Sequence, residues 1–127
     1  MKIFNLLLLS LLISSIASAQ QYTFKRVSTS GYDSKLNGEI SLTDSTVTIN
    51  TNGIVSDFDV EIITSAENYR QYKVIFSEET DQFIRISVTI PDPRPGLKKS
   101  ETGTLLYEHV DGFTGKVSTI IYYLIPK

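Results

Sequence analysis

Hydrophobic and polar residues alternate along most of the chain after residue 20. The clearest run is FIRISVTI at residues 83–90, in which Ile84, Ile86 and Val88 alternate with polar side chains. Successive side chains of a β-strand point to opposite faces, so such a run places one face in a core and the other in water. Similar runs occupy residues 22–28, 36–43, 45–50, 57–63, 69–76, 102–110 and 116–125. The pattern predicts an all-β protein of about eight strands.

Most of the connections between these runs are short and have the composition of turns. Residues 51–56 contain the pair Asn52-Gly53, a strong turn signal, and no window has helical periodicity over more than about one turn. Strands joined by short loops form an antiparallel meander. We therefore expect a small barrel or a curled, partly open barrel, because consecutive hairpins need no long crossovers. A two-layer β-sandwich is the alternative.

The last run, residues 116–125, is apolar on both faces. Ile121 and Tyr123 point one way, and Tyr122 and Leu124 point the other way. A strand that is buried on both sides has this pattern, whereas exposed edge strands usually carry charges. We expect this strand inside the sheet, paired with the first strand. The alternative is a contact between two subunits through Tyr122 and Leu124, so the sequence leaves a monomer and a weak homodimer open.

The N-terminal residues have the layout of a secretory signal peptide. Lys2 precedes an apolar run, and the small residues Ala17-Ser18-Ala19 follow it. The run is shorter than the ~20 residues that span a bilayer, so we expect cleavage rather than a retained anchor. Residues 1–19 are thus predicted to be removed, leaving residues 20–127 as one all-β domain without a transmembrane segment.

The amino-acid composition indicates the cellular compartment and the classes of partner that the protein favours. The chain has 12 Lys and Arg against 14 Asp and Glu, and Lys2 is the only charge in residues 1–19, so residues 20–127 carry 11 against 14, a net charge of −3. This balance does not favour nucleic-acid binding, which needs a basic surface. The absence of Cys fits a bacterial periplasmic or secreted domain better than a disulfide-stapled extracellular module.

Motifs for catalysis, metals or cofactors are lacking. His109 is the only histidine, and a zinc site needs further His or Cys ligands. Asp57, Asp59 and Glu61 alternate along one strand, so their spacing is too wide for all three to reach one calcium ion. The sequence also has no phosphate-binding glycine loop and no nucleophile elbow. We predict no cofactor and no metal, and a carboxylate-based hydrolase is only a weaker alternative.

The stretch IPDPRPGLKKSE, residues 90–101, interrupts the strands with three of the four prolines of the chain. Each proline fixes its own φ and biases the preceding residue toward an extended conformation. We expect a stiff loop that projects from the sheet. Such a loop is first explained as a structural connection, either a long crossover between sheet layers or a proline stop that blocks edge pairing. The functional alternative is a loop that presents Arg94, Lys98 and Lys99 to an anionic partner.

The aromatic residues suggest a second function. Tyrosine can line a cavity with its ring and its hydroxyl together. Tyr72, Phe76, Ile86 and Tyr107 are candidates to line a ligand cavity. The leading hypothesis is an exported, non-enzymatic binding or interaction domain, and the alternative is a small carrier barrel for an apolar ligand. A lined cavity of ~300 Å³ or more would favour the carrier.

Overall fold

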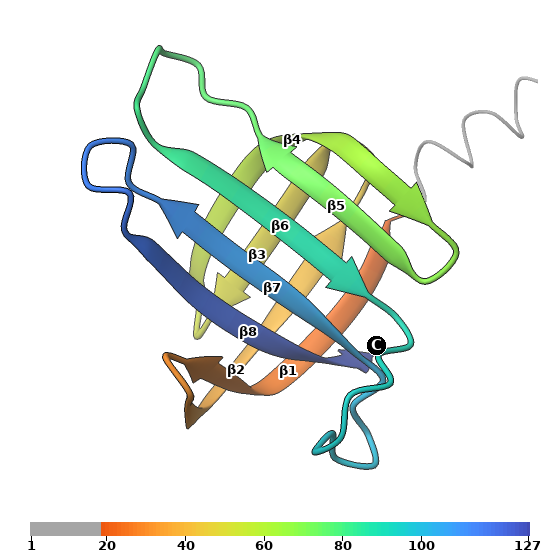
Figure 1. Ribbon diagram of the computed structural model, residues 1–127. Helices are drawn as coiled ribbons and strands as arrows, with labels where there is room; N and C mark the ends of the chain where they lie inside the picture. Colours follow the sequence, from red (N-terminus) through yellow and green to blue (C-terminus); the bar gives the residue numbers. More distant parts are fainter. Residues whose placement is uncertain (1–18) are drawn as a thin grey trace, which may run out of the picture.

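The computed structural model describes residues 19–127, which fold into eight antiparallel strands closed into a barrel (Figure 1). The strands are β1 Gln20–Thr29, β2 Tyr32–Leu42, β3 Thr46–Thr51, β4 Ile54–Ala66, β5 Tyr69–Val74, β6 Phe83–Thr89, β7 Gly103–Val110 and β8 Val117–Pro126. Each strand pairs with the next, and β8 pairs with β1. The meander and the barrel are therefore confirmed, and the sandwich alternative is wrong.

Within residues 19–127, no helix is long and apolar enough to cross a membrane. The predicted signal peptide, residues 1–19, lies almost entirely outside the described part of the chain, so its removal stays a prediction.

The last strand closes the barrel, as its two apolar faces predict. Val27 of β1 is the register partner of Tyr122 of β8. Tyr122 and Leu124 are buried in the core, while Tyr123 lies on the outer side of the same strand. The alternative of a subunit contact through Tyr122 and Leu124 is therefore wrong, because both side chains are buried inside the barrel.

The core runs along the barrel axis and is filled by side chains from all eight strands. Ile84, Ile86 and Val88 all belong to it, so the inner face predicted for residues 83–90 is confirmed. The rings of Phe58 on β4 and Tyr107 on β7 lie 5.8 Å apart, centroid to centroid. These strands are not neighbours in the sheet, so the two rings meet across the lumen and block it at that level.

A break in the alternation of β1 places the residues that matter for the site. Phe24 and Val27 are both buried in the core although they are three positions apart. The register of β1 shifts in this segment against both of its neighbours. A β-bulge of this kind re-aims side chains. It places Arg26 outside the barrel, whereas strict alternation from Phe24 would have pointed this residue inward.

Candidate functional site

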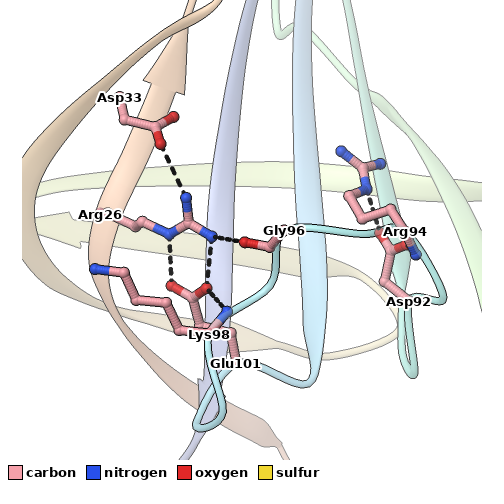
Figure 2. A network of polar contacts seen from close by, with 7 residues as sticks. All are labelled: Arg26, Asp33, Asp92, Arg94, Gly96, Lys98 and Glu101. Atoms are coloured by element: carbon pink, nitrogen blue, oxygen red, sulfur yellow. Dashed lines mark hydrogen bonds and ion pairs between the residues drawn. The ribbon is translucent and has the colours of Figure 1, made fainter.

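The proline-rich loop between β6 and β7 is bound to the barrel at a distant point of the chain. Because β6 and β7 pair with each other directly, the loop is a long hairpin connection, and the crossover alternative is wrong. The loop is nevertheless tied to the barrel, because Gly96 and Glu101 both accept hydrogen bonds from Arg26 of β1 (Figure 2). A side chain at least 70 positions away thus ties the loop to β1.

The contacts of Arg26 form a compact polar network, which we call the latch. Arg26 Nε donates to Glu101 Oε2 at 2.8 Å and Nη2 donates to Oε1 at 2.7 Å, a bidentate pair. Nη2 also donates to the carbonyl of Gly96 at 2.9 Å, and Nη1 to Asp33 at 3.0 Å. The guanidinium lies 3.7 Å from the centroid of the Tyr123 ring, a cation–π contact. All three nitrogens and one face of the guanidinium are therefore engaged.

Burial makes the latch electrostatically strong. The side chains of Arg26 and Glu101 are only 12% and 1% exposed. Hydrogen bonds from Arg26 hold the pKa of Glu101 below its ordinary value, and the same bonds raise the pKa of Arg26. The Lys98 backbone amide also donates to Glu101 Oε1, at 2.7 Å. The Glu101 carboxylate therefore binds its own loop through the Lys98 amide and binds β1 through Arg26.

A second, smaller network fixes the start of the loop. Asp92 accepts hydrogen bonds from the Thr104 hydroxyl at 2.6 Å and the Arg94 backbone amide at 2.9 Å, and it forms an ion pair with Arg94 Nε at 2.9 Å. Burial alone would raise the pKa of Asp92, but these donors outweigh burial and lower it. Figure 2 shows the Asp92–Arg94 pair apart from the latch, so Arg94 stabilises the start of its own loop.

A groove with a basic lining lies beside the latch. It measures about 430 Å³ and is lined by Lys25 and Lys35 of the β1–β2 hairpin and by Lys98 of the latched loop, together with Leu36, Asn37 and Asn52. The Asn52 backbone amide donates to the Asn37 carbonyl at 3.2 Å, which joins the β3–β4 turn to this wall. In Figure 2, the Lys98 side chain extends past Arg26 toward the ribbon that carries Arg26. The latch thus holds Lys98 at the groove.

Local charge favours anions in this groove. Among residues 19–127, the ion pairs do not involve Lys25, Lys35 or Lys98. The carboxylates in the latch, Asp33 and Glu101, are both bound to Arg26. Three lysines and one arginine against two carboxylates leave this neighbourhood with a net charge of plus two, on a domain that is acidic as a whole. The groove is therefore the basic site of an acidic protein.

Of the three predicted partner-binding residues, the structure brings one into the groove. Lys98 lines it, whereas Arg94 is paired with Asp92, and Lys99 is exposed and is not part of the lining. Sequence reasoning missed Lys25 and Lys35. The turn at residues 30 and 31 was the signal that could have found them, because a hairpin centred there brings both lysines to the same part of the barrel.

The predicted ligand-lining residues separate into two groups. Tyr72 and Ile86 are buried in the core, and Tyr107 packs against it. Phe76 lies on the connection after β5 and is 40% exposed. The structure therefore does not bring all four residues to one cavity, and the Tyr107 ring occupies the lumen together with Phe58.

The acidic row Asp57, Asp59 and Glu61 does not form a metal site. In the described part of the chain, no group of three or more His, Asp or Glu side chains is placed to hold a metal ion. Asp57 of the acidic row accepts a hydrogen bond from its cross-strand neighbour Thr48 at 2.7 Å, as a surface sheet residue does. Comparisons with models of protein families, with curated proteins and with solved structures gave no significant match.

Proposed function

We propose that this protein is an exported, non-enzymatic interaction domain that binds an acidic segment of a partner protein in the basic groove. The observation that carries this proposal is the convergence of Lys25, Lys35 and Lys98 on one groove, where no ion pair within residues 19–127 neutralises them. Carboxylates of the partner would form charge-assisted hydrogen bonds with these ammonium groups. The latch favours binding further, because a loop that is already held in place loses less entropy on association.

The remaining lining residues favour a polypeptide. Asn37 and Asn52 present amide groups that can donate to and accept from a peptide backbone. Leu36 adds an apolar contact for a side chain of the partner. The groove is open along one side and about 430 Å³ in volume, which suits a few residues of an extended chain.

The carrier and the hydrolase alternatives have less support. A carrier for an apolar ligand would need the lumen, where the Phe58 and Tyr107 rings meet. A hydrolase would need a carboxyl group with a raised pKa as its general acid. The carboxylates of Asp92 and Glu101 have the opposite property, since both pKa values are lowered by their donors.

Binding can be measured by calorimetric titration with a short polyglutamate peptide at low salt. Replacing Lys35 and Lys98 together by Gln should weaken binding about tenfold or more, because each lysine contributes a charge-assisted contact. The matched control replaces Lys73 and Lys116, which lie outside the groove, and should change the affinity less than about twofold. Equal losses in both variants, or no binding by the native protein, would refute the proposal.

Export is a separate part of the proposal and rests on the N-terminal sequence. Intact-mass measurement of the protein recovered from the envelope or medium of its own host should give a chain that begins at Gln20. A chain that retains residues 1–19 would contradict it.

A further inference from the structure

A second cavity lies in the mouth of the barrel, away from the basic groove. It measures about 170 Å³ and opens at the end of the barrel where β1 begins and β6 ends. Its wall includes the apolar side chains of Leu42, Val88 and Ile90 and two tyrosines, Tyr22 and Tyr72. Because β1 and β5 lie on opposite sides of the closed sheet, these two tyrosines face each other across the mouth. The wall thus combines apolar side chains with phenol groups, and Gln20 and Asn68 add polar side chains.

Charged groups of both signs stand at this mouth. Arg70 and Glu67 belong to the lining. The side chain of Tyr72 lies near Arg70 and raises the pKa of Arg70. Arg70 also forms an ion pair with Asp44 at 3.2 Å, in which the two side chains are 37% and 85% exposed. A pair this exposed contributes little, so a ligand carboxylate can replace Asp44 on Arg70.

We propose that the barrel mouth binds a small zwitterion of the amino-acid class that carries an apolar side chain. Its carboxylate would bind Arg70, its ammonium group would face Glu67, and its side chain would lie against Leu42, Val88 and Ile90. One guanidinium and one carboxylate line the mouth, so a zwitterion can form two ion pairs there where a simple anion or a simple cation forms one. The apolar part fits in size, because a cavity of ~150 Å³ accommodates a molecule such as benzene.

The experiment compares three ligands that share one apolar group. Leucine carries both charges, isovalerate carries only the carboxylate, and isoamylamine carries only the ammonium group. Each is titrated into the ¹⁵N-labelled protein, and amide shifts of the mouth residues are followed by NMR. Leucine should bind about tenfold or more tightly than either of the other two, because each lost charge removes a charge-assisted contact.

Two variants assign the charges to their partners. Arg70→Gln should weaken leucine and isovalerate about tenfold and leave isoamylamine unchanged. Glu67→Gln should weaken leucine and isoamylamine and leave isovalerate unchanged or tighter. Arg85→Gln is the matched control, because Arg85 is an arginine of the outer face that pairs with Glu108, and it should change none of the three affinities.

Three results would overturn the proposal. The first is no shift of the mouth residues with leucine at concentrations of about 10 mM, far above the millimolar affinity expected of a minimal site. The second is isovalerate binding as tightly as leucine. The third is an equal loss of all three ligands in Arg70→Gln, which would mean that Arg70 only shapes the wall. None of these results depends on the basic groove, since no residue lines both cavities.

Discussion

Two charged regions on the outside of the barrel use the same pairing in different surroundings. Arg26 binds Glu101 through two hydrogen bonds on the latched side. Arg85 binds Glu108 in the same bidentate manner across β6 and β7, at 3.0 and 3.2 Å. The first pair is covered by the loop, with side chains 12% and 1% exposed, whereas the second is 39% and 17% exposed. The geometry is similar, so the difference between the pairs lies in their access to water.

The comparison explains why the Arg26–Glu101 pair contributes strongly to stability and the Arg85–Glu108 pair contributes little. Arg85 and Glu108 belong to a cross-strand row of charges that also contains Glu61 and Lys73. Water and salt screen such a row, and removing one charge leaves its neighbours solvated. Removing one partner of the latch would leave a buried charge without a counter-ion, which is far more costly.

The largest expected effect is therefore the loss of Arg26. Arg26→Met would leave the Glu101 carboxylate buried with only the Lys98 amide as a donor. We expect the free energy of unfolding to fall by about 3–5 kcal/mol, measured by urea denaturation. The double variant Arg26→Met with Glu101→Met should recover much of this loss, because no buried charge remains. A loss below about 1 kcal/mol in the single variant would mean that the latch contributes no more than a surface ion pair.

A smaller effect should appear on acidification. The pKa of Glu101 is lowered in the folded protein relative to the ordinary glutamate value of 4.5. Its contribution to stability is therefore complete above pH 4.5 and is lost as the pH falls through the lowered pKa. Asp92 acts in the same direction relative to 3.8. Denaturation followed from pH 7 downward should show stability declining below about pH 4.5, and the Arg26→Met, Glu101→Met variant should decline less steeply. Parallel curves would contradict the assignment.

The smallest effect is expected at the exposed pair. Arg85→Gln should change the free energy of unfolding by no more than about 0.5 kcal/mol at moderate salt, since surface ion pairs contribute little. The measurement is the same urea denaturation, and the wild-type protein at high salt should behave like the variant. A loss as large as that of Arg26→Met would show that exposure does not separate the two regions.

Much of the barrel was predictable because its strands follow a local rule. The inner face of β6 could be assigned from alternation alone, and so could the position of β8 inside the sheet. The ends of strands were less predictable. The sequence pattern starts the second strand at residue 36, but β2 begins at Tyr32, because residues 32–35 extend the first hairpin beyond its apolar positions. Such residues are held by ladder hydrogen bonds rather than by burial.

The site could be predicted only in part, because it depends on contacts between distant residues. Lys98 stands in a basic, proline-rich stretch and was identified from its own surroundings. The latch joins Arg26 to Glu101 across 75 positions, and it requires the bulge that turns Arg26 outward. The alternation pattern does not predict a bulge. The contact between Arg26 and the loop therefore could not be predicted from the sequence. The basic groove was missed for the same reason, since its walls come from the β1–β2 hairpin, the β3–β4 turn and the latched loop.

The measurement that tests the account most directly is the affinity of the latch-free protein for polyglutamate. Arg26→Met with Glu101→Met removes one charge of each sign, so it releases the loop and leaves the net charge unchanged. If the latch holds Lys98 at the groove, the affinity should fall about tenfold, as expected for the loss of one charge-assisted contact. An affinity equal to that of the native protein, in a variant that remains folded, would contradict the account, because the groove would then not depend on the latch.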